Sequence, residues 1–274
     1  MIRYLRMGTR GAILVRAVPF IACLAVVLGG PSFGLDMGTG MKVAFVITAL
    51  WWIAFTIPLA KNVKQTHFRE RSAQLFKTTF SSLASTVKSI VHNKRLLFFL
   101  VAFFFYIDGV YTIIDMATAY GTSLGLNTTG LLLALLLTQI VAFPASLTFA
   151  VLSKTKDTAS LIKVAIIAYF LIALFAVQLD KQWEFWVLAV AVGCFQGGIQ
   201  ALSRSYFAKI IPENASGEYF GLFDICGKGA SFLGTMLIGV VTQITGKQNI
   251  GVAALSIMFV IGYLIFNKVS KMDD

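Results

Sequence analysis

Four charged residues interrupt stretches of the chain that are otherwise apolar. Asp108 and Asp115 lie in one such stretch, and Asp224 and Lys228 lie in another. A charge at the centre of a membrane helix costs about 2.5–3.5 kcal/mol on insertion scales, so each of these residues is a candidate for function. Carboxylates and an ammonium group in such places can bind a proton, a coupling ion or a charged part of a polar solute.

Asp108 begins a polar stripe along one face of a predicted helix. Tyr111, Thr112 and Asp115 follow it at spacings of three, four and seven residues, which place all four side chains on the same face. Lipid cannot solvate such a stripe, so it faces either a water-filled pathway or a neighbouring helix. Two carboxylates repel each other in a dry core, which favours the pathway and suggests that one of them holds a proton.

A second polar stripe consists of Gln196, Gln200 and Ser203, beside three glycines. The glycines indicate close helix packing, and the glutamines are candidates for hydrogen bonds to a substrate. Arg204 follows at the end of the stripe. It is interpreted either as a cytoplasmic gate that pairs with a carboxylate or as a topological anchor.

Asp224 and Lys228 are four residues apart with the acid first, which is the favourable order for a pair within one helix. They form either a neutralised structural pair or a contact for gating or for a substrate carboxylate. They lie in the predicted membrane span Tyr219–Ile244. It is rich in glycine, which predicts a closely packed helix that rocks.

The elements that position these residues are membrane helices. The chain has 274 residues, of which 58% are hydrophobic and only 13% are charged, whereas a soluble domain carries about 25% charged residues. About 20 apolar residues cross a bilayer. We therefore predict an all-α integral membrane bundle with these eight spans: Gly11–Gly30, Val43–Ala60, Leu96–Tyr120, Gly130–Leu152, Leu161–Leu179, Phe185–Leu202, Tyr219–Ile244 and Ile250–Phe266.

The distribution of positive charge predicts the orientation. With eight spans, 18 of the 23 Lys and Arg side chains fall on one side of the membrane, which places both termini in the cytoplasm. The net charge of +11 then reflects topology, and no nucleic-acid partner is expected.

The long connection over residues 61–95 separates residues 1–60 from residues 96–274 and predicts a domain boundary. Its apolar residues recur on one helical face. An amphipathic helix there either lies on the cytoplasmic membrane surface or packs as a linker. The residues of this face are Phe76, Phe80, Leu83, Val87 and Ile90.

Enzymatic chemistry has no signature in this sequence. The HExxH pattern, the phosphate-binding loop and the nucleophile elbow are all missing. The three cysteines and two histidines lack metal-ligand spacing, so neither a metal nor a cofactor is expected.

One segment resembles a known transporter family. The run Gln196-Gly-Gly-Ile-Gln-Ala-Leu-Ser-Arg-Ser205 is similar to the tenth-helix motif of the vacuole-effluxer branch of the major facilitator superfamily, which contains autophagy-related protein 22. The resemblance covers roughly residues 45–270. The supporting patterns, in the order expected for helices seven, eight and eleven, are Tyr106-Ile-Asp-Gly109, Gln139-Ile-Val-Ala-Phe-Pro144, and Glu218-Tyr-Phe-Gly221 with Gly227-Lys228.

This resemblance implies twelve helices in two six-helix halves that alternate access around a midplane cavity. Residues 96–266 would form the C-terminal half, and residues 11–60 only the fifth and sixth helices of the N-terminal half. The first four helices would be absent, either through a late start or because another chain supplies them. A bacterial inner (plasma) membrane is the expected location.

The implied function is secondary active transport, with export of small polar solutes such as amino acids and with proton coupling as an option. Asp108 would be a proton or substrate-amine site with Asp115 as its partner, Gln196 and Gln200 would bind substrate, and Lys228 would meet a substrate carboxylate or Asp224. The alternative is a truncated, non-transporting membrane protein that assembles with another membrane chain.

Overall fold

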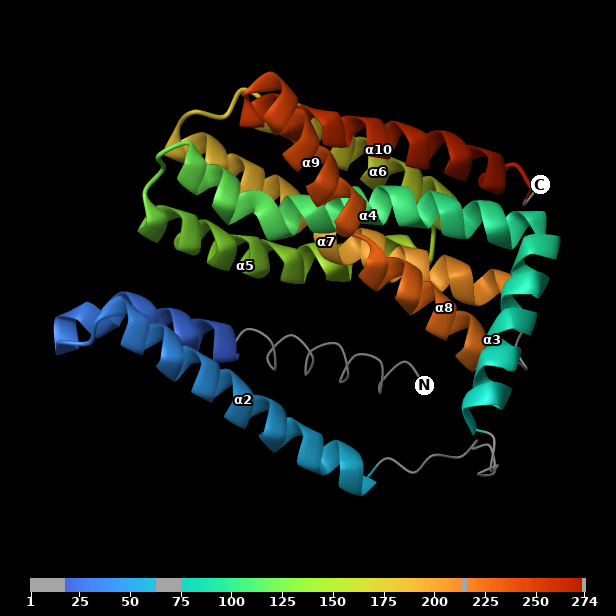
Figure 1. Ribbon diagram of the computed structural model, residues 1–274, viewed down its shortest axis with the longest axis horizontal. Helices are drawn as coiled ribbons and strands as arrows, with labels where there is room; N and C mark the ends of the chain where they lie inside the picture. The colour runs from blue at the N-terminus through green and yellow to red at the C-terminus, as the bar shows by residue number, and fades with distance from the viewer. Residues whose placement is uncertain (1–17, 63–74, 213–215, 273–274) are drawn as a thin grey trace. The chain divides into compact units, whose positions relative to one another are not determined.

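The computed structural model describes residues 18–62, 75–212 and 216–272, and these residues form helices without a strand (Figure 1). Seven helices in this described part are long and apolar enough to cross a membrane. The chain divides into two compact units, Met1–Ala73 and Gln74–Asp274. An all-α membrane bundle is therefore confirmed as the fold class.

The first unit contains two apolar helices joined by a tight turn. Residues 18–29 are helical and lead into the 3-10 helix η1 (Gly30–Phe33), and α2 (Met37–Asn62) follows. Gly34 at the turn has φ 75°, which glycine adopts without strain. Of the predicted span Gly11–Gly30, residues 11–17 lie outside the described part of the chain.

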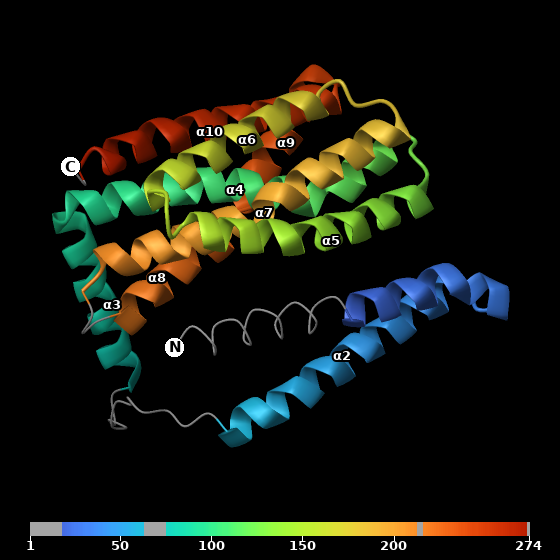
Figure 2. The ribbon, with the colours of Figure 1, turned by 180° about the vertical axis from the view of Figure 1, so that it is seen from behind.

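The second unit carries every charged candidate residue. Its long helices alternate in direction, so that successive helices begin at opposite ends of the bundle (Figure 2). Helix α5 packs along α7, and α10 packs against α4, α6 and α9. The helices are α3 (Leu75–His92), α4 (Lys94–Ser123), α5 (Thr128–Leu152), α6 (Thr158–Ala176), α7 (Gln182–Ile210), α8 (Ser216–Gly229), α9 (Phe232–Thr245) and α10 (Gln248–Ser270).

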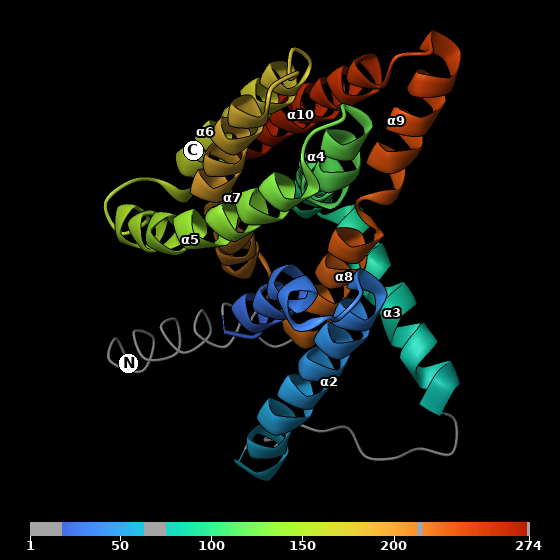
Figure 3. The same ribbon diagram turned by 90° about the vertical axis from the view of Figure 1, so that its left-hand side faces the viewer.

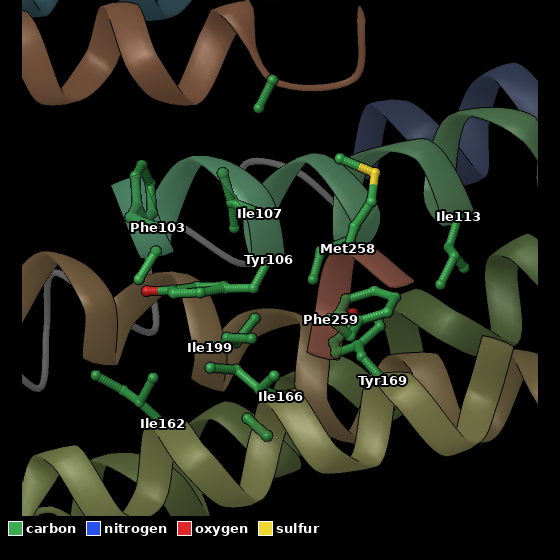
Figure 4. Packing of buried hydrophobic residues seen from close by; sticks show 14 of the residues in the cluster. Phe103, Tyr106, Ile107, Ile113, Ile162, Ile166, Tyr169, Ile199, Met258 and Phe259 are labelled. Carbon is green, nitrogen blue, oxygen red and sulfur yellow. The ribbon is translucent and has the colours of Figure 1, made fainter. Parts of the chain in front are cut away.

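Aromatic rings and glycines fix the packing of α4 against its neighbours. The rings of Tyr169 and Phe259 stack with centroids 5.8 Å apart, in the same layer as Tyr106 (Figure 4). A Cβ added at Gly109 would lie 2.6 Å from the Phe259 ring, and one at Gly262 would lie 2.9 Å from Tyr106 Cβ. Glycine at both positions therefore lets α4 and α10 approach closely.

The amphipathic helix predicted in the long connection is present as α3. It runs across the end of the second unit at which α4 begins, instead of along the bundle (Figures 1 and 2). Asn93 separates the two helices, and its side-chain oxygen caps α4 by accepting a hydrogen bond of 3.2 Å from Leu96 N. Helix α3 packs against α4 and α8.

The predicted span Tyr219–Ile244 is confirmed as the apolar helical segment Ser216–Thr245, one of the seven, but this segment has a break inside it. The glycine-rich segment forms two shorter helices, α8 and α9, that meet at Ala230 and Ser231. Figure 3 shows the change of direction between them. Glycine-rich sequence lowers helix propensity, and here the polar contacts described below stabilise the break.

Candidate functional site

The break between α8 and α9 leaves backbone groups that need hydrogen-bond partners. Ser231 has φ 82°, a left-handed conformation that residues other than glycine rarely adopt. The N–H groups in the first turn of a helix have no partner within that helix. Inside a membrane they must be satisfied by protein, because lipid offers no acceptor.

Asp108 of α4 supplies that acceptor. Its side chain is fully buried, and its Oδ1 accepts hydrogen bonds from Ser231 N at 2.6 Å and Gly234 N at 3.1 Å. Gly234 N also lies 3.2 Å from Oδ2, and the Thr112 hydroxyl donates to Oδ1 at 3.3 Å. A carboxylate in this position caps the positive end of α9.

Gly234 lets α9 approach this carboxylate. A Cβ added there would lie 2.9 Å from Thr112 Cβ and 3.0 Å from Asp108 Oδ1, and it would also overlap the Thr112 hydroxyl. Any larger residue would push α9 away from α4. The cap therefore depends on an acid in one helix and a glycine in the other.

The predicted polar stripe on α4 is divided between two environments. Asp108 and Thr112 are fully buried, and Asp108 accepts hydrogen bonds from α9, so both residues belong to a contact between helices, which is the second of the two predicted environments. Tyr111 is half-buried and Asp115 is exposed. In the described part of the chain, Asp115 has no hydrogen-bond or ion-pair partner.

Arg204 of α7 forms an ion pair with Asp224 of α8. Its guanidinium also lies over the rings of Phe220 and Phe223, 5.6 and 5.8 Å from their centroids. Cation–π contacts of this kind hold an arginine in place beside a carboxylate. Both charged side chains remain about half exposed, at 56% and 47%.

Among the described residues Asp224 pairs with Arg204, and the intrahelical pair of Asp224 with Lys228, one of the two interpretations from the sequence, is not observed. Asp224 is held by a guanidinium from another helix, and Lys228, one turn further along α8, is exposed. Tyr111 and Asp115 lie on α4, which packs against both α7 and α8. The four side chains Tyr111, Asp115, Arg204 and Asp224 therefore come from three helices that are in contact within the second unit.

Gln196 of α7 lines a small cavity between α4, α5 and α7. The cavity has a volume of about 40 Å³ and also contains Gln139 of α5 and the aliphatic wall of Val192. The Gln196 Oε1 atom is buried and has no hydrogen-bond partner among the described residues. A cavity of this size holds water but no solute.

The other members of the second predicted stripe have different surroundings. The Ser203 hydroxyl donates to Ile199 O at 2.7 Å, so Tyr106 must be the donor of the 2.6 Å hydrogen bond that joins the two hydroxyl groups. Ser203 is therefore part of the packing between α4 and α7. Gln200 is half-buried.

The start of α8 is attached to α3. The Thr86 hydroxyl donates to Glu218 Oε2 at 2.8 Å, and the hydroxyl groups of Ser89 and Tyr219 are 2.9 Å apart. Together with the Arg204–Asp224 pair and the Asp108 cap, these contacts hold the α8–α9 element through polar groups along its length.

The comparisons with known proteins agree with this arrangement. A family model described as vacuole effluxer Atg22 like matches residues 5–272. The chain belongs to this family. It is also 41% identical over 250 residues to the uncharacterized MFS-type transporter YxiO of Bacillus subtilis, a match that covers 90% of this chain and 58% of the relative. It is therefore a multi-pass membrane protein.

Fungal relatives are more distant. Autophagy-related protein 22 of Eremothecium gossypii is 29% identical over 268 residues, covering 90% of this chain and 52% of the relative. Autophagy-related protein 22-1 of Aspergillus niger is 24% identical, covering 93% and 44%. The chain thus spans about half the length of the curated relatives it matches.

Sequence reasoning did not identify the hydrogen-bond donors to Asp108, which are the backbone amides of Ser231 and Gly234. A signal was present, because Gly229-Ala230-Ser231 places three small residues in the middle of an otherwise apolar helix. A break in such a run exposes backbone N–H groups, and a buried acid on another helix that has no predicted partner can accept hydrogen bonds from them. Gln139, which shares the cavity of Gln196, was noted only as part of a motif.

Proposed function

We propose that this chain forms the substrate-binding half of a secondary transporter for small polar solutes that carry both an amine and a carboxylate, such as amino acids. Members of this family are carriers, and the observation that carries the proposal is the α8–α9 break capped by Asp108. Discontinuous helices surround the substrate sites of many secondary transporters. Export by alternating access, with proton coupling, completes the proposal.

The charged groups divide into two sets under this proposal. Asp108 and the Arg204–Asp224 pair hold the α8–α9 element, and Arg204 acts as a gate. Asp115 and Lys228 are exposed on α4 and α8, two helices that pack together. We assign Asp115 to the substrate amine and Lys228 to the substrate carboxylate.

Half-buried polar residues on α4 and α7 would bind the polar remainder of the solute. Tyr111 lies about one turn before Asp115 on α4, and its hydroxyl can donate and accept a hydrogen bond. Gln200 would bind the solute directly, and Gln196, one turn earlier on the same helix, would do so through a water molecule, because its unsatisfied oxygen faces a cavity that admits only water. Binding of the solute by these three side chains would need no cofactor.

The experiment is flux of radiolabelled amino acids in proteoliposomes that contain the purified chain. Substrates are compared with their amides, which lack the carboxylate, and with their decarboxylated amines. We expect Lys228→Gln to reduce flux of the amino acid far more than flux of the amide. We expect Asp115→Asn to reduce flux of every substrate that carries an amine.

Two results would contradict the proposal. If the unmodified chain and Lys228→Gln both transport the amino acid and its amide at equal rates, Lys228 does not contact a substrate carboxylate. If no solute moves and the chain instead purifies with a second membrane chain, the protein is an assembling membrane subunit. Proton coupling is tested separately by an imposed pH gradient, which should change the rate of transport in the unmodified chain.

A further inference from the structure

Helix α3 has two different apolar faces. One face packs inward, where Ile90 is 5% exposed and Thr86 is 4% exposed. The hydrogen bonds from Thr86 to Glu218 and between Ser89 and Tyr219 fix that face against α8. The orientation of α3 is therefore set by contacts within the second unit.

The other apolar face points away from the protein. Phe80 is 71% exposed, Val91 is 54% exposed and Val87 is 43% exposed. Their spacings of seven and four residues place them on a single helical stripe, with Ala84 between them. The sequence assigned Ile90 and Phe80 to the same face, but the structure separates them.

The charges around this stripe have one sign. Residues 75–95 contain four Lys and Arg residues and one His but neither Asp nor Glu. Lys88 is exposed next to the stripe, four residues after Ala84 and three before Val91, and Lys94 is exposed at the start of α4. An apolar stripe flanked by cations is typical of helices that lie in the interface of an anionic bilayer.

We propose that α3 is a docking surface for anionic phospholipid. Its axis runs across the end of the bundle (Figure 1), which places it along the membrane surface when the long helices cross the membrane. Phe80, Val87 and Val91 enter the upper acyl region, and the lysines meet headgroup phosphates. This inference goes beyond transport, since it holds whether or not the chain moves a solute.

The test uses the full chain with Cys23, Cys194 and Cys226 changed to Ser. Single cysteines at Phe80 or Val87, and at the exposed Ser85 on another face as a control, carry an environment-sensitive fluorophore. The vesicles are phosphatidylcholine with or without phosphatidylglycerol, and they contain a lipid with a nitroxide quencher near the headgroup. We expect severalfold stronger quenching at 80 and 87 than at 85, and an increase with phosphatidylglycerol.

A charge variant tests the anionic preference. Replacing Lys88 and Lys94 by Gln should weaken the effect of phosphatidylglycerol by about fivefold per lysine. The control changes Lys154 and Lys156 to Gln, which removes the same charge from the loop between α5 and α6. Circular dichroism and size-exclusion chromatography confirm that each variant folds.

Three results would overturn the proposal. Equal lipid quenching at 80, 87 and 85 would mean that the stripe does not enter the bilayer. Lipid quenching of equal strength with and without phosphatidylglycerol would mean that α3 does not prefer anionic lipid. Protection at 80 and 87 from both the lipid quencher and aqueous iodide would mean that a protein surface covers the stripe.

Discussion

Removing the Asp108 cap from α9 should destabilise the second unit, and the loss of stability should be larger in Asp108→Ala than in Asp108→Asn. In Asp108→Ala, the amides of Ser231 and Gly234 lose their acceptor and remain buried. Each unsatisfied buried group costs about 1–3 kcal/mol, so the substitution should cost about 2–6 kcal/mol. In Asp108→Asn an amide oxygen still accepts, and only the interaction of the negative charge with the helix N-terminus is lost, which is worth about 0.5–2 kcal/mol.

Thermal unfolding in detergent measures this difference. A unit of about 200 residues loses roughly 2–4 °C of Tm for each kcal/mol. We therefore expect Tm to fall by about 4–24 °C in Asp108→Ala and by about 1–8 °C in Asp108→Asn. A thiol-reactive dye can follow the transition, because Cys194 and Cys226 are free and partly buried in the same unit.

Asp115→Asn is the matched control. It makes the same chemical change two turns along the same helix, at an exposed side chain, so Tm should stay within about 1 °C. The reasoning fails if Asp108→Asn and Asp115→Asn have the same Tm. It also fails if Asp108→Ala is no less stable than Asp108→Asn, because the two amides would then not depend on the carboxylate.

Three further predictions concern the same unit. Gly234→Ala should lower Tm by several degrees, because its methyl group would overlap the polar groups that cap α9. Tyr106→Phe should cost about 1 kcal/mol, measured by the same unfolding assay, because Ser203 keeps its own acceptor and loses only a donor. Burial raises the pKa of Asp157, but hydrogen bonds from the amide and hydroxyl of Ser160 outweigh it and hold the pKa below 3.8. The stabilisation from this carboxylate should therefore be fully present above a pH of about 4 and be lost as the pH falls through the lower folded pKa, and Asp157→Asn should remove that part of the pH dependence of Tm.

Gly234→Ala and Tyr106→Phe each have a comparison on the same helix. Gly239→Ala adds a methyl group with nothing within 4 Å and should leave Tm unchanged. Tyr111→Phe removes a half-buried hydroxyl without a hydrogen-bond partner among the described residues, so it should be milder than Tyr106→Phe. If the two variants of either pair change Tm by the same amount, the contact on which that prediction rests is wrongly assigned.

Periodicity and composition were sufficient to predict most of the helices, because an apolar stretch of membrane length has few alternatives. The helix in the long connection was also found, because its apolar residues recur at helical spacing. The break at Ser231 could not be derived in this way. The segment Ser216–Thr245 is apolar enough to count as a single membrane span, and the break depends on an acid 123 residues away in the chain.

The partners of the charged residues were harder to predict than their positions. Spacing favours Asp224 and Lys228 as a pair, since sequence shows only neighbours on the same helix. The observed partner, Arg204, lies on α7 and is held by the rings of Phe220 and Phe223. Arg204 and Lys228 could both form an ion pair with Asp224, and tertiary packing determines that Arg204 does so.

The bonding state of each polar group now separates structural roles from functional ones. Asp108 is fully buried and has several donors, so it cannot meet a solute without giving up a contact that holds the α8–α9 element, and Asp224 is already held by a guanidinium although it is half exposed. Asp115 and Lys228 have no such contact in the described part of the chain. The residues whose charge is hardest to explain by packing are therefore the ones that should bind the solute, whereas Asp108 and Asp224 should set how far the broken helix can move when it does.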